Sequence, residues 1–334
     1  MMKIENLFIA SLLCAGLMSG CSGSQEGAKN NGSSAPELNR MKCEYVPDGE
    51  EAIIFGKNLS NVQVTFPGDL KAEIGSQNDT MVKEVVPEGT KEGRIKAESA
   101  NGKAFSKFFF RDDRNTIINF DRRLATWGGY SPMEEDGTLI TGTLEQGDEI
   151  TPFPNGAKLP EPCSGNYGFL YGKYSTPWAM NQCMYLQYVA NPMEGGRGNI
   201  SVAGPVFEKY DIEELALKFE VYVPQEVAYK GIRTEIFFGP INSPDKHGRE
   251  YSPIYFWKPY EESGEFYTDS WTTVTIPLTE FCHNTSTDEA NPEYTYKDKL
   301  KQATNFSFLQ FGKPEGEPQI FMCVDNFRIV PISD

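Results

Sequence analysis

Apolar and polar residues alternate in short runs along most of the chain, and this pattern predicts strands rather than helices. In the first third of the chain, turn residues separate these runs at the short, regular intervals typical of a β-sandwich. The strands predicted there are 52–55, 62–66, 71–74, 82–86, 93–97 and 104–110. We therefore expect a small all-β domain over residues 42–111.

A second β-rich unit is predicted over residues 112–334. Its clearest run is 215–223, in which Leu217, Phe219, Val221 and Val223 share one face of the strand. Further strands are predicted at 116–121, 234–239, 272–278, 306–311 and 319–330. So many strands in one larger unit suggest a jelly-roll β-sandwich. Arg111–Asn115 is polar and pairs each arginine with an acidic neighbour, which favours a solvated domain boundary over a ligand site.

Two segments of the first domain carry a resemblance to a known family. Gly56-Lys57-Asn58-Leu59 matches a G-x-N-[FL] turn, and Val85–Gly93 matches a V-P-x-G-x-x-x-G segment. The domain resembles the immunoglobulin-like (Ig-like) domains of the IPT/TIG family. The resemblance implies an Ig-like sandwich that serves as a spacer.

The N-terminus has the features of an export signal. Lys3 precedes the apolar run 7–17, which is shorter than the roughly 20 residues that span a bilayer. Leu17-Met18-Ser19-Gly20-Cys21 resembles the lipobox of bacterial lipoproteins, which implies removal of residues 1–20 and acylation of Cys21. The alternative is an ordinary secretory signal with a chance cysteine. Residues 21–41 are small and polar, and predict a flexible tether.

The formal net charge of −16 is acidic, and it is unchanged when the signal segment removes Lys3 and Glu5 together. An acidic surface repels phosphate backbones, so nucleic acid is excluded as a partner, and a heavily sulfated or uronic-acid-rich ligand is disfavoured. After Cys14 and Cys21, an odd number of cysteines remains, with no Cys-x-x-Cys pair, so their pairing stays open. These are Cys43, Cys163, Cys183, Cys282 and Cys323, the last of which reads as a buried free thiol.

No motif for catalysis, a cofactor or a metal is evident. His247 and His283 lie in loop-like surroundings, and neither a zinc-ligand spacing nor a G-x-S-x-G elbow occurs. Two carboxylates would be enough for a glycosidase. The acidic runs Glu134-Glu135-Asp136 and Glu261-Glu262 are better explained as solvated turns, so no catalytic residue is predicted.

Aromatic residues indicate the most specific chemistry, because sugar rings stack their C–H faces on flat aromatic side chains. Trp257 precedes Pro259 and an acidic run, so we expect it in a loop and available for binding. Trp271 opens a predicted strand and reads as a packing residue. Trp178 follows turn residues and Trp127 precedes Gly128-Gly129-Tyr130, and for both of these tryptophans binding and packing are equally favoured.

Several segments of the second domain carry a second resemblance. They are Phe256–Tyr260, Gly264–Thr268, Trp271–Phe281 and Val324–Ile329. The domain resembles the C-terminal glycan-binding domain of Bacteroidetes surface glycan-binding lipoproteins of the SGBP-B type, which are non-catalytic. The resemblance implies an outer-membrane position beside a TonB-dependent transporter of the starch-utilisation type and its glycan-binding lid lipoprotein. The Trp-x-Pro-Trp loop of that family carries over to Trp257 and Tyr260, the second tryptophan being a tyrosine here.

The leading hypothesis is therefore a lipid-anchored surface protein that binds a neutral plant polysaccharide. Two alternatives remain: a surface glycoside hydrolase or lyase with an Ig-like spacer, and an adhesin or structural lipoprotein whose aromatics are all packed. The glycan-binding residues predicted are Trp257, Tyr260, Trp178, Trp127 and Tyr130.

Overall fold

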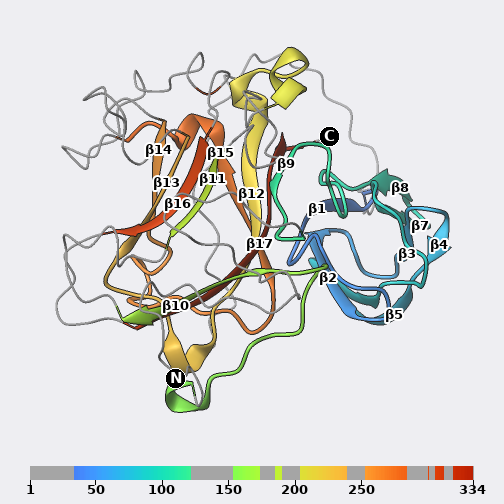
Figure 1. Cartoon of the computed structure of the whole chain (residues 1–334). Helices are drawn as coiled ribbons and strands as arrows, with labels where there is room; N and C mark the ends of the chain where they lie inside the picture. The colour runs from blue at the N-terminus through green and yellow to red at the C-terminus, as the bar shows by residue number, and fades with distance from the viewer. Residues whose placement is uncertain are drawn as a thin grey trace, which may run out of the picture. The chain divides into compact units, whose positions relative to one another are not determined.

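The computed structural model describes residues 34–121, 153–173, 185–189, 204–238, 253–283, 300, 305–311 and 319–333. Their regular elements are β-strands with short 3₁₀ turns, so the all-β prediction is confirmed (Figure 1). Residues 34–334 form one compact unit. None of the described segments contains a helix with the length and hydropathy needed to cross a bilayer.

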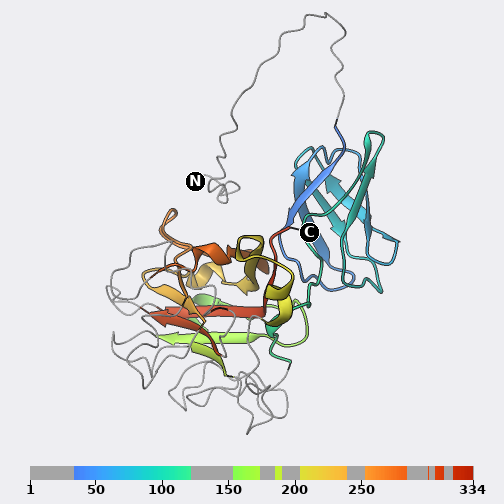
Figure 2. The same ribbon diagram turned by 90° about the horizontal axis from the view of Figure 1, so that it is seen from above.

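The N-terminal sandwich consists of two four-stranded antiparallel sheets, ordered β1-β2-β6-β5 and β4-β3-β7-β8 (Figures 1 and 2). Leu38, Ile54, Val64 and Val82 fill the space between the sheets, each at most 1 % exposed. The strands are β1 (Glu37–Met41), β2 (Glu51–Lys57), β3 (Gln63–Phe66), β4 (Leu70–Lys71), β5 (Glu73–Gln77), β6 (Met81–Val85), β7 (Lys96–Ser99) and β8 (Gly102–Phe105).

The turn after β2 shows why its sequence takes the G-x-N-[FL] form. A Cβ at Gly56 would lie 1.7 Å from the Glu37 carbonyl oxygen, so only glycine lets β1 approach here. Asn58 has a positive φ of 55° and donates through its side chain to the Ala35 carbonyl at 3.0 Å. Leu59 then enters the core. The motif is thus explained by backbone geometry and packing.

β1 lies at the C-terminal end of the segment predicted as a tether, 21–41. It pairs with β2, and Leu38 and Met41 are buried. This strand has few apolar residues and follows a polar stretch, so the N-terminal sandwich begins earlier than the sequence pattern indicates.

The C-terminal sandwich packs one sheet, ordered β10-β17-β12-β15 with β9 added to β17, against a second sheet, ordered β11-β16-β13-β14. The aromatic side chains of Phe219, Phe308 and Phe327 meet between them, with ring centroids 4.9–5.5 Å apart. The strands are β9 (Thr116–Ile118), β10 (Gly168–Lys173), β11 (Tyr185–Val189), β12 (Leu215–Tyr222), β13 (Arg233–Phe237), β14 (Ile254–Trp257), β15 (Thr272–Pro277), β16 (Asn305–Phe311) and β17 (Gln319–Pro331).

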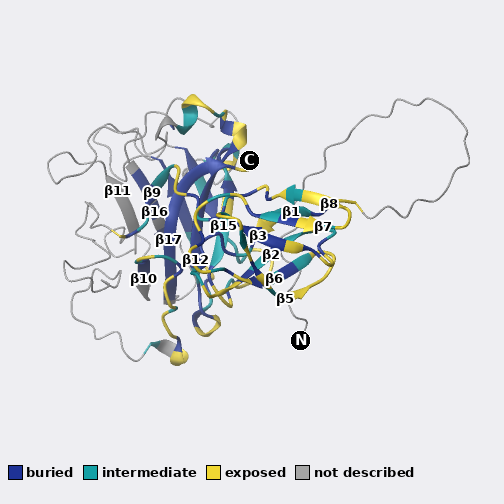
Figure 3. Ribbon diagram, turned by 90° about the vertical axis from the view of Figure 1, so that its right-hand side faces the viewer, coloured by how far each residue is buried: buried dark blue, intermediate teal, exposed yellow. Residues whose placement is uncertain are grey.

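β12 confirms the predicted alternation and adds a second buried face. Leu217, Phe219 and Val221 lie in the sandwich core, as expected. Lys218 and Glu220, which alternate with them, are also buried, at 3 % and 0 % exposed (Figure 3). The polar face of this strand is therefore covered by protein rather than by water.

A β-bulge in β17, opposite β12, changes which alternate residues of β17 face the core. Ile320, Met322 and Val324 point into the core, and after the bulge Phe327 and Ile329 do so. Asn326, with φ of 50°, is the extra residue. The bulge places Asp325 and Arg328 together on the same outer face as Glu220.

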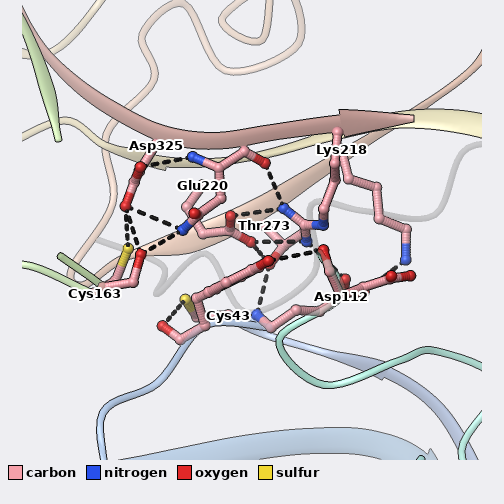
Figure 4. Close-up of polar contacts among 12 residues, drawn as sticks. Cys43, Asp112, Cys163, Lys218, Glu220, Thr273 and Asp325 are labelled. Atoms are coloured by element: carbon pink, nitrogen blue, oxygen red, sulfur yellow. Dashed lines mark hydrogen bonds and ion pairs between the residues drawn. The ribbon is translucent and has the colours of Figure 1, made fainter. Parts of the chain in front are cut away.

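A buried ionic network occupies this outer face, where Figure 4 labels Lys218, Glu220 and Thr273, and it includes Glu44 of the N-terminal sandwich. Arg328 donates to Glu44 at 2.8 Å and to both Glu220 carboxylate oxygens at 2.8 and 3.1 Å. Lys218 donates to the second Glu44 oxygen at 2.7 Å. Thr273 donates to Glu220 at 2.8 Å and accepts the Glu44 backbone N–H at 2.7 Å. These contacts connect the two sandwiches through paired charges, although the Arg328 Nε atom has no hydrogen-bond partner among the described residues.

The polar segment 111–115, predicted as a solvated boundary, is exposed at Asp113 and Arg114, whereas Asp112 is buried. Asp112 is 2 % exposed and its carboxylate accepts two hydrogen bonds from the Arg114 guanidinium, at 2.7 and 2.8 Å. Arg111 pairs with Asp48 at 2.8 Å. The charges satisfy one another locally, which lets the connection between the sandwiches pack closely.

Candidate functional site

Trp257 lies at the end of β14, and the prediction that it lies in a loop is wrong. Its indole is 6 % exposed, because strand pairing with Thr234 turns it toward the sandwich interior. One face stacks on Tyr229 at a centroid distance of 6.0 Å, and Phe219 and Phe266 approach edge-on at 5.5 Å. These are the contacts of a packing residue, while a role of Trp257 in glycan binding stays a prediction.

Tyr260 lies in the turn after β14 and is half-buried. The turn is closed by the Gly264 N–H, which donates to the Tyr260 carbonyl at 2.7 Å, and Gly264 has a φ of 83°. The Tyr260 ring meets Tyr229 edge-on at 5.7 Å. Its pKa is raised by burial and by the charge of Glu261, so the phenol is a neutral donor at physiological pH. Tyr260 thus offers a fixed aromatic ring and a hydroxyl on a loop.

A polar and aromatic row lies on the face of β13 and β14 opposite to Trp257, and its members Glu235 and Phe256 are buried, at 0 % and 6 % exposed. Arg233 donates to Glu235 at 2.7 Å, and its guanidinium lies 4.0 Å from the centre of the Phe256 ring. The positive charge of Arg233 also acts on Tyr260, where it lowers the pKa against the larger effect of burial. We name Arg233, Glu235, Phe256 and Tyr260 the β13–β14 row.

His283 borders this row, with its ring 4.8 Å from that of Phe256. Burial lowers the pKa of His283, so the imidazole is neutral near pH 7. Its Nδ1 atom is buried and has no hydrogen-bond partner among the described residues. A neutral imidazole nitrogen can accept from or donate to a hydroxyl group, depending on its tautomer.

Sequence reasoning missed the β13–β14 row except for Tyr260. The available signal was Arg233-Thr234-Glu235, two charged residues two positions apart in a strand whose other face is apolar. The sequence predicts a loop at His283, whereas the residue forms an isolated antiparallel β-bridge with Ile254. The row depends on strand pairing and so could not be assembled from the sequence.

The remaining predicted residues divide into two groups. Trp127, Tyr130, Trp178 and the lipidation residue Cys21 lie outside the described residues, and their roles stay predictions. Trp271 is confirmed as a packing residue: it is buried, and its indole N–H donates to the Glu161 carbonyl at 2.8 Å. Cys323 is confirmed as a buried free thiol. The described segments contain no group of histidine, cysteine or acidic residues arranged to hold a metal ion.

A family match shows that the chain is in the class of surface glycan-binding proteins. Residues 110–331 match the family model described as the surface glycan-binding protein B xyloglucan binding domain. This match spans well over half of the chain, and the chain belongs to that family. Its function is surface glycan binding. A search of the curated proteins found none that matches the sequence.

Solved structures show the same fold. The surface glycan-binding protein PbSGBP-B from Prevotella bryantii is 19 % identical, with a TM-score of 0.61 over 90 % of this chain and 77 % of that one. An SGBP-B from a complex xyloglucan utilization locus in Bacteroides uniformis is 18 % identical, with a TM-score of 0.50 over 89 % and 74 %. A crystal structure with xylogluco-oligosaccharide is 18 % identical, with a TM-score of 0.51 over 89 % and 58 %.

Proposed function

We propose that this chain is a lipid-anchored outer-membrane protein that binds a neutral plant polysaccharide of the xyloglucan type without cleaving it. The observation that carries the proposal is the match of residues 110–331 to a xyloglucan-binding family. One relative comes from a xyloglucan utilization locus in Bacteroides uniformis, and another was crystallised with xylogluco-oligosaccharide, which supports the same ligand class. The net charge of −16 agrees with a neutral ligand, because it would repel an anionic one.

The β13–β14 row supplies the chemistry that this function needs. Tyr260 offers a ring for stacking on a sugar face and a hydroxyl for a hydrogen bond. Arg233, which its ion pair with the fully buried Glu235 orients, offers a charged donor to sugar hydroxyls. We further propose Trp127, Tyr130 and Trp178 as glycan-stacking residues. Trp257 contributes indirectly: its indole packs against Tyr229, and Tyr229 in turn contacts the Tyr260 ring and fixes its position.

The anchor and the N-terminal sandwich complete the proposal. Acylation of Cys21 would fix the chain to the outer membrane, and residues 22–33 would provide reach. The N-terminal sandwich, as an IPT/TIG-type spacer, would hold the glycan-binding domain away from the membrane. The captured glycan would then pass to a TonB-dependent transporter and its glycan-binding lid lipoprotein.

Affinity electrophoresis tests the glycan-binding proposal. The protein is run through native gels that contain xyloglucan, mixed-linkage β-glucan or polygalacturonate, the last as the anionic control. We expect xyloglucan to retard the wild type and polygalacturonate to leave it unaffected. Retardation by the anionic glycan alone, or by none of the three, would overturn the proposal.

Variants locate the site in the same gels. Tyr260→Ala removes a half-buried ring, and loss of one stacking contact should weaken binding roughly tenfold. Phe105→Ala is the matched control, because Phe105 is an aromatic residue 53 % exposed in the N-terminal sandwich and should not affect binding. Equal retardation of Tyr260→Ala and the wild type would exclude Tyr260 from the site. Release of oligosaccharides from xyloglucan by the wild type, followed by chromatography, would instead identify a hydrolase or a lyase.

A further inference from the structure

The outer face of one sheet in the N-terminal sandwich is basic, although the chain as a whole is acidic. The sheet is β4-β3-β7-β8, and its outward side chains alternate with the core residues Val64 and Ala97. We name this outer surface the basic face. It holds four basic side chains and one carboxylate around an aromatic ring, from Lys71, Arg94, Lys96, Lys103, Glu98 and Phe105.

Strand pairing brings these side chains together. Thr65 of β3 lies opposite Lys71 of β4 and Lys96 of β7. Lys96 in turn lies opposite Phe105 of β8. Residues directly opposite each other in antiparallel strands point to the same side of the sheet, with Cβ atoms about 5 Å apart. The Arg94 guanidinium joins this row, because it lies 5.8 Å from the centre of the Phe105 ring.

Most of the positive charge on the basic face is available to a partner. Lys71, Arg94 and Lys103 are exposed, and neither of these lysines forms an ion pair with another described residue. Lys96 lies 3.9 Å from the Glu98 carboxylate, which is a weak, partly exposed pair. The turns that border the face add Lys91, Asp69 and Glu92, so the face remains net basic.

Phe105 adds an apolar element to this basic surface. Its ring is 53 % exposed, the largest exposed fraction among the large hydrophobic residues that the structure describes. β8, which carries it, is exposed along most of its length (Figure 3). Basic side chains around an exposed aromatic ring suit an anionic membrane surface, because the charges attract the headgroups and the ring enters their boundary with the acyl chains.

The other sheet of the same sandwich provides a contrast. On the outer face of β1-β2-β6-β5, basic and acidic residues are matched: Arg40, Lys57 and Lys83 against Glu37, Glu51 and Glu73. The excess of positive charge is therefore a property of one sheet and not of the whole sandwich.

The acidic residues of the chain are concentrated in the second domain. Residues 122–334 contain 30 acidic and 17 basic residues, whereas residues 34–121 contain 15 and 12. At physiological ionic strength the Debye length is about 8 Å, so charges farther from the basic face act on its partner only weakly. The overall charge of −16 therefore does not prevent this face from binding an anionic surface.

The described part of the chain begins at the same edge of the sandwich. Ala35 packs against Gly102, the first residue of the edge strand β8, where an added Cβ would lie 3.2 Å from the Ala35 Cβ. Residues 22–33 separate this edge from Cys21 and span at most about 40 Å when fully extended. An acyl chain on Cys21 would therefore keep β8, and with it the basic face, close to the membrane.

We propose that the basic face docks on the anionic lipid headgroups of the membrane that holds the anchor, with Phe105 at the headgroup boundary. This docking rests on the lipid anchor of the proposed function, which raises the local concentration of headgroups around the face. Lipid phosphates are acceptors that lysine and arginine side chains bind through charge-assisted hydrogen bonds. Docking would hold the N-terminal sandwich in one orientation on the membrane instead of leaving it free to rotate about residues 22–33.

Vesicle flotation tests the docking with residues 22–334, which lack the lipid but retain the whole compact unit. Vesicles of phosphatidylcholine alone are compared, at millimolar lipid, with vesicles that also contain phosphatidylglycerol. We expect the protein to float with the anionic vesicles only, and less of it as NaCl is raised from about 0.05 M to about 0.5 M. Equal flotation with both kinds of vesicle, or with neither, would overturn the proposal.

Two double variants locate the docking surface. Lys71→Gln with Lys103→Gln removes two exposed charges from the basic face. Each basic residue near an anionic surface contributes roughly a fivefold change in binding, so this variant should bind roughly 25-fold more weakly. Lys57→Gln with Lys83→Gln is the matched control, because it changes the net charge equally on the other sheet and should bind as the wild type does. Equal weakening of the two double variants would show an effect of net charge alone and overturn the assignment.

Phe105→Ala and xyloglucan gels separate docking from glycan binding. Phe105→Ala should weaken flotation with anionic vesicles and leave retardation by xyloglucan unchanged. In the wild type, glycan binding without flotation would overturn only the docking, and flotation without glycan binding would overturn only the glycan-binding function. Incorporation of labelled fatty acid at Cys21 in cells tests the anchor separately, and its absence would overturn the anchor.

Discussion

At the scale of single residues, Trp257 and Tyr260 have different environments although only two residues lie between them. Trp257 is enclosed by Tyr229, Phe219 and Phe266, whereas Tyr260 lies half-buried in a turn. The alternation of a strand turns Trp257 inward, and the chain leaves the sheet before Tyr260 is reached. Truncation of the two side chains should therefore affect different properties of the protein.

Trp257→Ala should lower the free energy of unfolding by about 3–5 kcal/mol, because it removes a buried indole and leaves a cavity in the sandwich core. Urea unfolding followed by fluorescence or circular dichroism measures this change. Tyr260→Ala is the matched comparison and should cost less stability. If Trp257→Ala abolished glycan binding with unchanged unfolding, the indole would belong to the binding surface after all.

Glu84 is a second residue with a definite consequence. It is fully buried in β6, and its carboxylate oxygens have no hydrogen-bond partner among the described residues. Burial raises the pKa of Glu84 to about 8, from 4.5 in the unfolded chain. Between pH 4.5 and about pH 8, the folded state therefore keeps a proton on Glu84 that the unfolded chain has released. The stability that this proton provides is fully present below about pH 4.5 and is lost as the pH rises through about 8.

Glu84→Gln removes the ionisation while it keeps the shape of the side chain. Relative to wild type, it should gain stability between pH 5 and pH 8, on the order of 3 kcal/mol in total. Thermal unfolding of both proteins at the two pH values gives the comparison. Parallel pH profiles for the two proteins would show that Glu84 has no raised pKa.

At the scale of elements, the bulge in β17 explains the Val324-Asp325-Asn326-Phe327-Arg328-Ile329 segment. Asn326 shifts the register, which allows Val324 and Phe327 to fill the core while Asp325 and Arg328 face outward. Burial, opposed by the hydrogen bond from Ser164, raises the pKa of Asp325. The carboxylates of Glu44 and Glu220 pair with Lys218 and Arg328.

Removal of one charge from this network should be costly. Glu44→Ala removes the carboxylate that pairs with Lys218 and one of the two carboxylates that pair with Arg328 in a buried site, which should lower stability by about 3–5 kcal/mol. Glu51→Ala is the control, because its ion pair with Lys83 at 3.3 Å is exposed and worth about 0.5 kcal/mol. Chemical denaturation measures both changes, and equal effects of the two variants would contradict the role given to the network.

At the scale of the whole molecule, the two sandwiches share a hydrophobic cluster as well as the network. Val46 of the first sandwich and Trp271, Phe169 and Phe321 of the second belong to it. Two domains with such a shared interior should unfold together. We expect calorimetry to show one transition for the wild type. In Glu44→Ala the two sandwiches should separate into two transitions, and two transitions in the wild type would contradict the coupling.

The sequence by itself determined the all-β class, the order of most strands and the inward face of β12, because alternation of apolar and polar residues is a local property of an extended chain. The sequence also indicated the protein family, because the motifs of that family are short and their residues are neighbours in the chain. Of the predicted glycan-binding residues, Tyr260 lies in the turn where it was expected.

The tertiary structure decided what the polar positions face. Alternation separates the two faces of β12, but it does not tell whether Lys218 and Glu220 meet water or another domain. Likewise, the sequence shows that Trp257 is near a turn, and only the pairing of β14 with β13 shows that its ring is enclosed. Burial and ion pairing arise from contacts between residues far apart in the chain, such as Glu44 and Arg328, and no local pattern records such contacts.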